Sequence, residues 1–163
     1  METAIKLCRK WAYEVKGIDM NDAEIVVCKN NFHGRTTTII SFSNDPVARK
    51  NFGPYTDGFI KIEYDNLQEL EDVLSNNENV AGFLVEPIQG EAGVYVPSDD
   101  YLKKAKALCE KYNVLFIADE VQTGIARTGR LLASCGNCDC PTKSCEGTPD
   151  VKPDILILGK ALS

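Results

Sequence analysis

Two charged side chains, Lys160 and Asp119, each follow a short apolar run and are the first candidates for chemistry. Asp119 follows Val114-Leu-Phe-Ile-Ala118, and Lys160 follows Asp154-Ile-Leu-Ile-Leu-Gly159. Such runs are typical of buried parallel strands, whose carboxyl ends form the ligand sites of open α/β sheets. A lysine in apolar surroundings loses its proton more easily and can then act as a nucleophile. A buried carboxylate needs a partner, and the cationic ring nitrogen of a ligand would supply one.

Both residues also have an interpretation without chemistry. Asp119 or Glu120 could cap the turn that follows the strand, because short acidic side chains accept hydrogen bonds from turn N–H groups. A lysine after a strand and a glycine is often only a solvated side chain. The two residues therefore have to be weighed together with the other motifs.

Polar motifs also follow two other apolar runs. One run is followed by Phe32, the only histidine and Arg35, and another is followed by Glu86 and Glu91. Arginine suits bidentate binding of a carboxylate, and Phe32 could stack on a flat ligand or join the core. The two glutamates could balance charge at a site or could be solvated. Each motif alone leaves both interpretations open.

Short apolar runs alternate with amphipathic stretches along the chain, which predicts one α/β unit with a parallel sheet and helical crossovers. The strands are expected at 23–28, 59–64, 80–85, 114–119 and 154–158. The helices are expected over 2–16, from an Asp65 cap to Leu74, and from a Ser98 cap to Tyr112 with Asp99 and Asp100 in the first turn. A β-branched run covers 36–43, and 44–58 is expected to be a loop.

The composition excludes several classes of protein. A chain of 163 residues with 44% apolar content can bury a single-domain core. A net charge of −6 and a pI near 4.9 argue against binding to nucleic acid or to an anionic membrane surface. No stretch approaches the roughly 20 apolar residues of a membrane span, and residues 1–10 lack the features of a signal peptide.

The seven cysteines fall into two groups. Cys8, Cys28 and Cys109 lie in apolar-periodic segments, where a buried free thiol in a reducing compartment is expected. The other four are spaced as Cys135-x-x-Cys138-x-Cys140-x₄-Cys145. Thiolates at this spacing could hold zinc or pair on oxidation, or the segment could be a surface insertion without chemistry. A zinc site usually joins two separated pairs of ligands, so no metal site is predicted.

Together these motifs resemble the pyridoxal-phosphate-dependent aminotransferases that act on ω-amino groups. The resemblance is carried by Phe32-His-Gly-Arg-Thr36, Asn51-Phe-Gly-Pro54, Val85-Glu-Pro-Ile-Gln-Gly-Glu-Ala-Gly-Val94, the segment 115–130 and Lys152-Pro-Asp-Ile-Leu-Ile-Leu-Gly-Lys-Ala-Leu-Ser163. It implies the large domain of fold type I, a mostly parallel sheet with helices on both faces.

The resemblance also implies roles around the cofactor, pyridoxal 5'-phosphate. Lys160 would form the internal aldimine and, once released, would carry the proton between substrate and cofactor. Asp119 would pair with the pyridinium nitrogen and keep it protonated. Phe32 and Val121 would pack against the two faces of the ring, and Gln122 would bind the ring hydroxyl.

Two further residues would contact or gate the substrate. Arg35 resembles the clamp for the α-carboxylate, and Glu91 resembles the family's gating glutamate, which neutralises a second arginine during the first half-reaction.

The implied reaction moves the δ-amino group of L-ornithine to 2-oxoglutarate, giving glutamate 5-semialdehyde and glutamate. The match over 31–36 and 51–54 favours ornithine, while acetylornithine and 4-aminobutyrate remain alternative amino donors. Family members are homodimers with small-molecule amino-acid and 2-oxo-acid substrates. The implied compartment is the cytoplasm or the mitochondrial matrix, and secretion is not expected.

The resemblance covers only part of such an enzyme. The glycine-rich phosphate loop would precede Met1; the partner-subunit threonine, the second arginine and the small domain would follow Ser163. Residues 1–163 are therefore expected to form a large domain truncated at both ends, with a cysteine-rich insertion at about 133–150. An inactive truncated product that pairs with a full-length subunit or binds metal is the non-enzymatic alternative.

Overall fold

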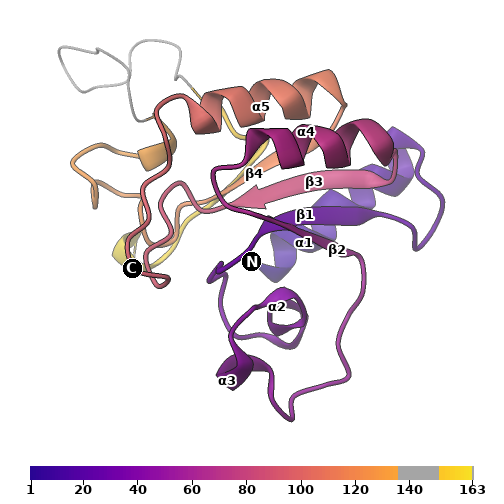
Figure 1. The fold of residues 1–163 in the computed structure, drawn as a ribbon, viewed down its shortest axis with the longest axis horizontal. Helices are drawn as coiled ribbons and strands as arrows, with labels where there is room; N and C mark the ends of the chain where they lie inside the picture. Colours follow the sequence, from indigo (N-terminus) through magenta and orange to yellow (C-terminus); the bar gives the residue numbers. More distant parts are fainter. Residues whose placement is uncertain (136–150, 163) are drawn as a thin grey trace.

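Five parallel strands form the centre of the molecule in a computed structural model that describes residues 1–135 and 151–162. Their order in the sheet is β2-β1-β3-β4-β5 (Figure 1). The strands are β1 (Glu24–Cys28), β2 (Phe59–Ile62), β3 (Val80–Val85), β4 (Leu115–Asp119) and β5 (Ile155–Ile157). The expected parallel α/β sheet is therefore confirmed, and each expected strand is present within three residues of its predicted ends.

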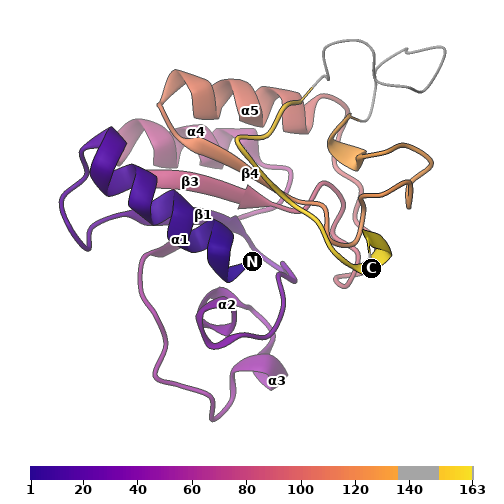
Figure 2. The same cartoon turned by 180° about the vertical axis from the view of Figure 1, so that it is seen from behind.

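Helices cover both faces of this sheet (Figures 1 and 2). On one face lie α4 (Leu67–Asn76) and α5 (Tyr101–Lys111), whose buried side chains pack against Val26, Phe83 and Phe116. The other face is covered by α1 (Glu2–Trp11), which continues as a π-helical turn over Ala12–Lys16, and by α2 (Thr37–Phe42). Because both faces are covered, all six residues of β3 are buried, as expected of a central parallel strand.

Helix α1 packs closely against the sheet at Gly82 of β3. A Cβ atom at this position would lie 2.6 Å from the Sγ atom of Cys8 and 3.1 Å from Cδ1 of Ile117. Both neighbours are buried in the core, so neither side chain can move into solvent. Gly82 therefore fixes the distance between α1 and the sheet.

We expect Gly82→Ala to lower the free energy of unfolding by about 1–3 kcal/mol, because it overpacks this contact. Urea denaturation of the full encoded protein measures the loss. Adding Cys8→Ala should recover part of it, since that change removes the sulfur in the way. Equal stability of Gly82→Ala and wild type would contradict this account of the α1 packing.

Three local predictions are wrong, namely the loop over 44–58 and the two helix caps Asp65 and Ser98. The expected loop 44–58 contains a short helix, α3 (Pro46–Arg49), capped by Asp45. The β-branched run 36–43, for which no element was predicted, forms α2. Neither Asp65 nor Ser98 caps a helix: Asn66 caps α4 by accepting a hydrogen bond from the N–H of Glu69.

Asp65 and Ser98 miss these caps because they bind each other. The N–H and Oγ of Ser98 donate to the two carboxylate oxygens of Asp65 at 2.9 and 2.7 Å. Helix α5 then begins at Tyr101, and Asp99 and Asp100 precede it. The pair joins the loop before α5 to the turn before α4.

Cys8, Cys28 and Cys109 are buried thiols without a disulfide, as expected. Burial raises the pKa of each to about 12, so they are unreactive near neutral pH. Of the cysteine-rich segment, Cys135 is described and buried, while the positions of its other three cysteines lie outside the described residues. Within 1–135 and 151–162, no group of three or more His, Cys, Asp or Glu side chains could hold a metal ion. No helix in these ranges has the length and apolar character needed to cross a membrane.

Candidate active site

The carboxyl ends of four strands surround one cavity of about 300 Å³. From β1 the chain crosses to β2 on one side, and it returns to β3 on the other, so β1 and β3 meet at a topological switch point. The loops after β1, β3, β4 and β5 all contribute to what we call the strand-end cavity. Its lining residues are Met1, Phe32, His33, Gly34, Glu86, Ile88, Asp119, Val121, Gln122 and Lys160.

This cavity brings together five of the seven residues to which the family resemblance gave a role: Phe32, Asp119, Val121, Gln122 and Lys160. Arg35 and Glu91 are both exposed and do not line it. The guanidinium of Arg35 lies 5.8 Å from the centre of the Phe32 ring, so it is at the rim next to a lining residue. The roles expected for Arg35 and Glu91 stay predictions.

Asp119 ends β4 with its carboxylate buried and held on both oxygens. His33 Nδ1 donates to Oδ2 at 2.6 Å, and the N–H of Val121 donates to Oδ1 at 3.1 Å. The second contact is the turn cap that the sequence left as an alternative. The turn cap is therefore present, while the pairing of Asp119 with a cationic ligand stays a prediction; the cap uses only one of its two oxygens.

His33 is the residue that sequence reasoning passed over. It is buried beside Asp119, and its Nε2 atom has no hydrogen-bond partner among the described residues. Its only signal in the sequence was its place between Phe32 and Gly34 as the sole histidine. Through Nδ1 it fixes the orientation of the Asp119 carboxylate.

Glu86 is a second acidic group in the cavity, just beyond the end of β3. Its Oε2 accepts a hydrogen bond from the N–H of Phe32 at 3.1 Å. Burial is the main cause that raises its pKa to about 7, although the nearby His33 acts in the opposite direction. Near neutral pH this carboxyl is therefore partly protonated and can donate a hydrogen bond, which an ordinary glutamate cannot.

Lys160 begins a short 3₁₀ turn after β5 and has a positive φ of 47°. The sequence predicted apolar surroundings for it, but in the described part of the chain Lys160 is exposed. The reason is the place of β5 at the edge of the sheet, where Leu156 is 39% exposed as well. Lys160 lines the strand-end cavity all the same.

Glycines let Val121 and Gln122 reach the cavity. A Cβ atom on Gly90 would lie 2.7 Å from Nε2 of Gln122, and a Cβ atom on Gly159 would lie 3.2 Å from Cγ1 of Val121. The loop after β3 therefore packs directly on the Gln122 amide, and the residue before Lys160 packs directly on Val121.

Chemically, the cavity combines an anionic acceptor, an amine, an aromatic ring, an aliphatic side chain and a primary amide. The amino end of α1 also faces it through Met1, and a helix amino end favours an anion such as a phosphate. A flat, cationic ligand that carries an anionic group and reacts with an amine fits this set of groups.

Residues 1–163 match the model of a known family, "Aminotransferase class-III". The ornithine aminotransferase of Plasmodium falciparum is 54% identical over 99% of this chain and 36% of its own length. The mitochondrial ornithine aminotransferase of Drosophila melanogaster is 57% identical over 99% of this chain and 35% of its own length. The chain spans roughly a third of the length of these relatives.

Solved structures give the same result. The ornithine aminotransferase of Toxoplasma gondii matches with a TM-score of 0.87 at 50% identity, over 99% of this chain and 35% of that one. An acetylornithine aminotransferase of Elizabethkingia anophelis matches with a TM-score of 0.73 at 61% identity, over 99% of this chain and 36% of that chain. Another structure of the Toxoplasma enzyme has partial occupancy of pyridoxal phosphate at its active site.

Proposed function

Since this chain belongs to the class-III aminotransferase family, we propose that it is part of an enzyme that transfers the δ-amino group of ornithine to 2-oxoglutarate with pyridoxal 5'-phosphate. The observation that carries the proposal is the strand-end cavity, where Asp119, Gln122 and Lys160 arrive from two neighbouring strands. Names of relatives at 50–57% identity support ornithine as the amino donor.

Pyridoxal phosphate fits the groups around the cavity, and when bound it withdraws electrons from the substrate carbon that bears the amine. Asp119 is the anion for its ring nitrogen, and His33 holds that carboxylate in place. Phe32 and Val121 supply surfaces for the ring, and Gln122 supplies an amide for its hydroxyl.

Lys160 is proposed as the residue that binds the cofactor covalently. Once substrate has displaced it, its amine would accept the proton from the substrate carbon and donate it to the cofactor, which is general acid–base catalysis.

The substrate-binding roles fall to the two residues at the rim. Arg35 would bind the α-carboxylate of the amino donor with its guanidinium. Glu91, on the exposed loop after β3, would neutralise a second arginine supplied from outside the described residues. Both positions leave these side chains free of the buried network around Asp119.

Residues 1–163 are proposed to be part of the larger cofactor-binding domain of a homodimer. Support comes from the coverage, since the chain matches only about a third of each relative. Mitochondrial relatives in Drosophila melanogaster and Caenorhabditis elegans support the matrix as one compartment.

Acetylornithine is a second candidate donor, favoured by the 61% identity to the Elizabethkingia enzyme. The full encoded protein, assayed with 2-oxoglutarate and either ornithine, N-acetylornithine or 4-aminobutyrate, separates them. We expect kcat/KM for ornithine to exceed the others by at least about tenfold, or about 1.4 kcal/mol of discrimination. A preference for N-acetylornithine would overturn the assignment of ornithine as the amino donor. If none of the three donors is transaminated, the enzyme assignment is overturned.

A further inference from the structure

Glu120 is a buried carboxylate that the proposed chemistry does not use. It lies between Asp119 and Val121, yet it does not line the strand-end cavity, and its side chain is fully buried. A buried glutamate is costly unless its charge is compensated. Within 1–135 and 151–162, no Lys, Arg or His lies within ion-pair distance of it.

Three uncharged donors hold this carboxylate. The N–H of Ser134 donates to Oε1 at 2.7 Å, the N–H of Ala133 donates to Oε2 at 3.1 Å, and the hydroxyl of Thr123 also donates to Oε2. Such bonds to an ionised acceptor are roughly twice as strong as neutral ones. Two of the donors lie thirteen and fourteen residues further along the chain.

The backbone of Glu120 is fixed as well. Its N–H donates to the carbonyl of Ile157 in β5 at 3.0 Å, and its carbonyl accepts from the N–H of Gly124 at 2.8 Å. Glu120 thus connects the end of β4 to two other segments. One is the edge strand β5, which leads to Lys160, and the other is the turn at 133–134.

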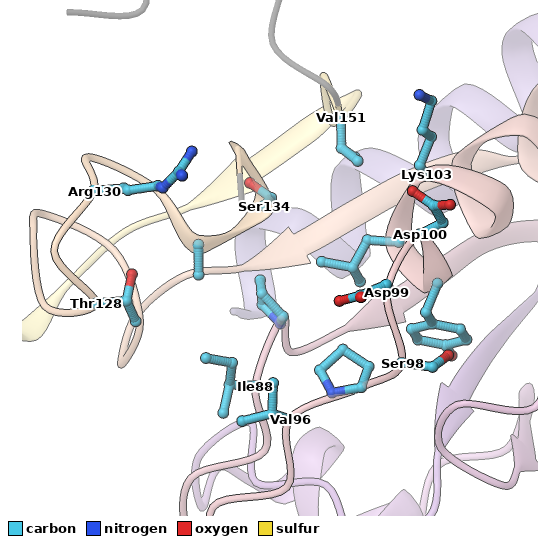
Figure 3. Close-up of a pocket in the computed structure, with 15 residues that line it drawn as sticks. Ile88, Val96, Ser98, Asp99, Asp100, Lys103, Thr128, Arg130, Ser134 and Val151 are labelled. Atoms are coloured by element: carbon cyan, nitrogen blue, oxygen red, sulfur yellow. The ribbon is translucent and has the colours of Figure 1, made fainter. Parts of the chain in front are cut away.

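Glu120 also links residues of two cavities. Its neighbours in the chain, Asp119 and Val121, line the strand-end cavity. Its hydrogen-bond donors Ala133 and Ser134 line an outer cavity of about 240 Å³ (Figure 3). The turn at 133–134 forms a wall of the outer cavity (Figure 3), and Glu120 ties this wall to the strand end.

We propose that Glu120 is a positioning residue: its bonds to Thr123, Ala133 and Ser134 fix the turn that aims Val121 and Gln122 into the strand-end cavity. The inference rests on the proposed function, because it assumes that these side chains bind pyridoxal phosphate. The backbone of Gln122 has to be placed accurately, since its side-chain amide packs directly against Gly90.

The test is Glu120→Gln in the full encoded protein. Glutamine keeps the volume but offers one oxygen to three donors, so at least one donor loses its acceptor. We expect the dissociation constant for pyridoxal phosphate to rise about tenfold. The visible circular dichroism of the bound cofactor should change at equal saturation, which a loss of stability alone would not cause.

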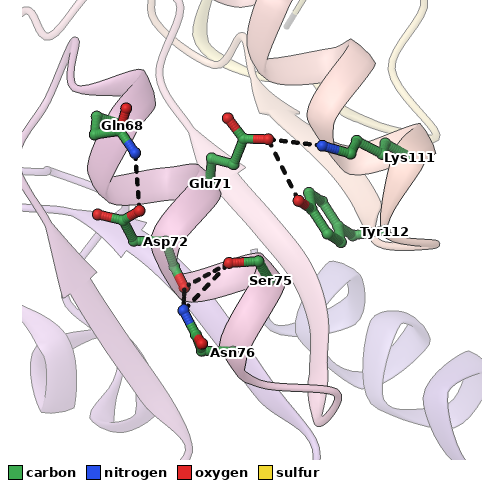
Figure 4. Close-up of polar contacts among 7 residues, drawn as sticks. All are labelled: Gln68, Glu71, Asp72, Ser75, Asn76, Lys111 and Tyr112. Atoms are coloured by element: carbon green, nitrogen blue, oxygen red, sulfur yellow. Dashed lines mark hydrogen bonds and ion pairs between the residues drawn. The ribbon is translucent and has the colours of Figure 1, made fainter.

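Glu71→Gln is the matched control. The Glu71 carboxylate on α4 likewise accepts hydrogen bonds, from Lys111 Nζ at 2.7 Å and from the hydroxyl of Tyr112 at 3.3 Å (Figure 4). Glu71 does not line the strand-end cavity. This variant should lose stability while its cofactor affinity and dichroism stay at wild-type values.

Thr123→Val removes only one donor and keeps the shape of the side chain, so it tests the proposal even where Glu120→Gln does not fold. It should weaken cofactor binding in the same direction, by a smaller factor. Unchanged affinity and dichroism in a folded Glu120→Gln or in Thr123→Val would overturn the positioning role, as would an equal effect in Glu71→Gln. A wild-type protein that binds no pyridoxal phosphate would instead overturn the proposed function.

Discussion

Lys160→Ala is expected to lower the rate of transamination at least about 10⁴-fold, because it removes both the amine that binds the cofactor and the base that moves the proton. No other lysine lines the strand-end cavity in the described part of the chain. Initial rates of the full encoded protein with ornithine and 2-oxoglutarate measure the loss.

Lys152→Ala is the control for this variant. Lys152 is exposed, like Lys160, and it precedes β5 while Lys160 follows it, so it lies at the opposite end of the same strand. Its removal should leave the rate within about twofold, since surface substitutions away from a site change little. A Lys160→Ala protein that keeps more than a tenth of the wild-type rate would refute the role given to this lysine.

Asp119→Asn is expected to lower kcat about 10²–10³-fold, the usual cost of removing one preorganised electrostatic contact. The amide is nearly isosteric with the carboxylate, so its oxygen can still accept a hydrogen bond from His33 or Val121. What is lost is the negative charge that would keep the ring nitrogen of the cofactor protonated. Steady-state kinetics, with cofactor supplied in excess, separate this loss from weaker cofactor binding.

His33→Ala serves as the comparison for Asp119→Asn. It leaves the charge of Asp119 in place but removes the 2.6 Å hydrogen bond that orients it. Its kcat should therefore fall less than that of Asp119→Asn. The reverse order would contradict the assignment of the charge to Asp119 and of the orienting contact to His33.

The sheet could be predicted because its strands are continuous apolar runs. Val80–Val85 was expected as a strand and is one with the same bounds, since a strand buried on both faces needs no alternation. The segment 36–43 could not be assigned from the sequence, because its β-branched residues are common in strands although the segment forms a helix. There Ile39 and Phe42, three residues apart, share one face of a short helix and are buried against α1 and the sheet.

Helix starts were less predictable because their caps depend on distant residues. Asp65 and Ser98 look like local caps, but they are 33 residues apart and bind each other. No local pattern reveals such a pair.

The candidate site also contains residues that the sequence could locate and contacts that it could not. Phe32, Asp119 and Lys160 could be located because each closely follows a strand, and strand ends meet at one edge of a parallel sheet. Gln122 was located through the family resemblance, and it lines the same cavity. The contact between His33 and Asp119 joins residues 86 apart, and Glu120 works through a turn beyond its own strand. These depend on the packed structure.

The most direct test of the account is to find which residue carries the cofactor. The full encoded protein is saturated with pyridoxal phosphate, reduced with borohydride to make any lysine linkage permanent, digested and examined by mass spectrometry. We expect the pyridoxyl mass on Lys160 alone, with no modified lysine in the Lys160→Ala variant. Modification of another lysine in preference to Lys160, or of none, would contradict the central claim.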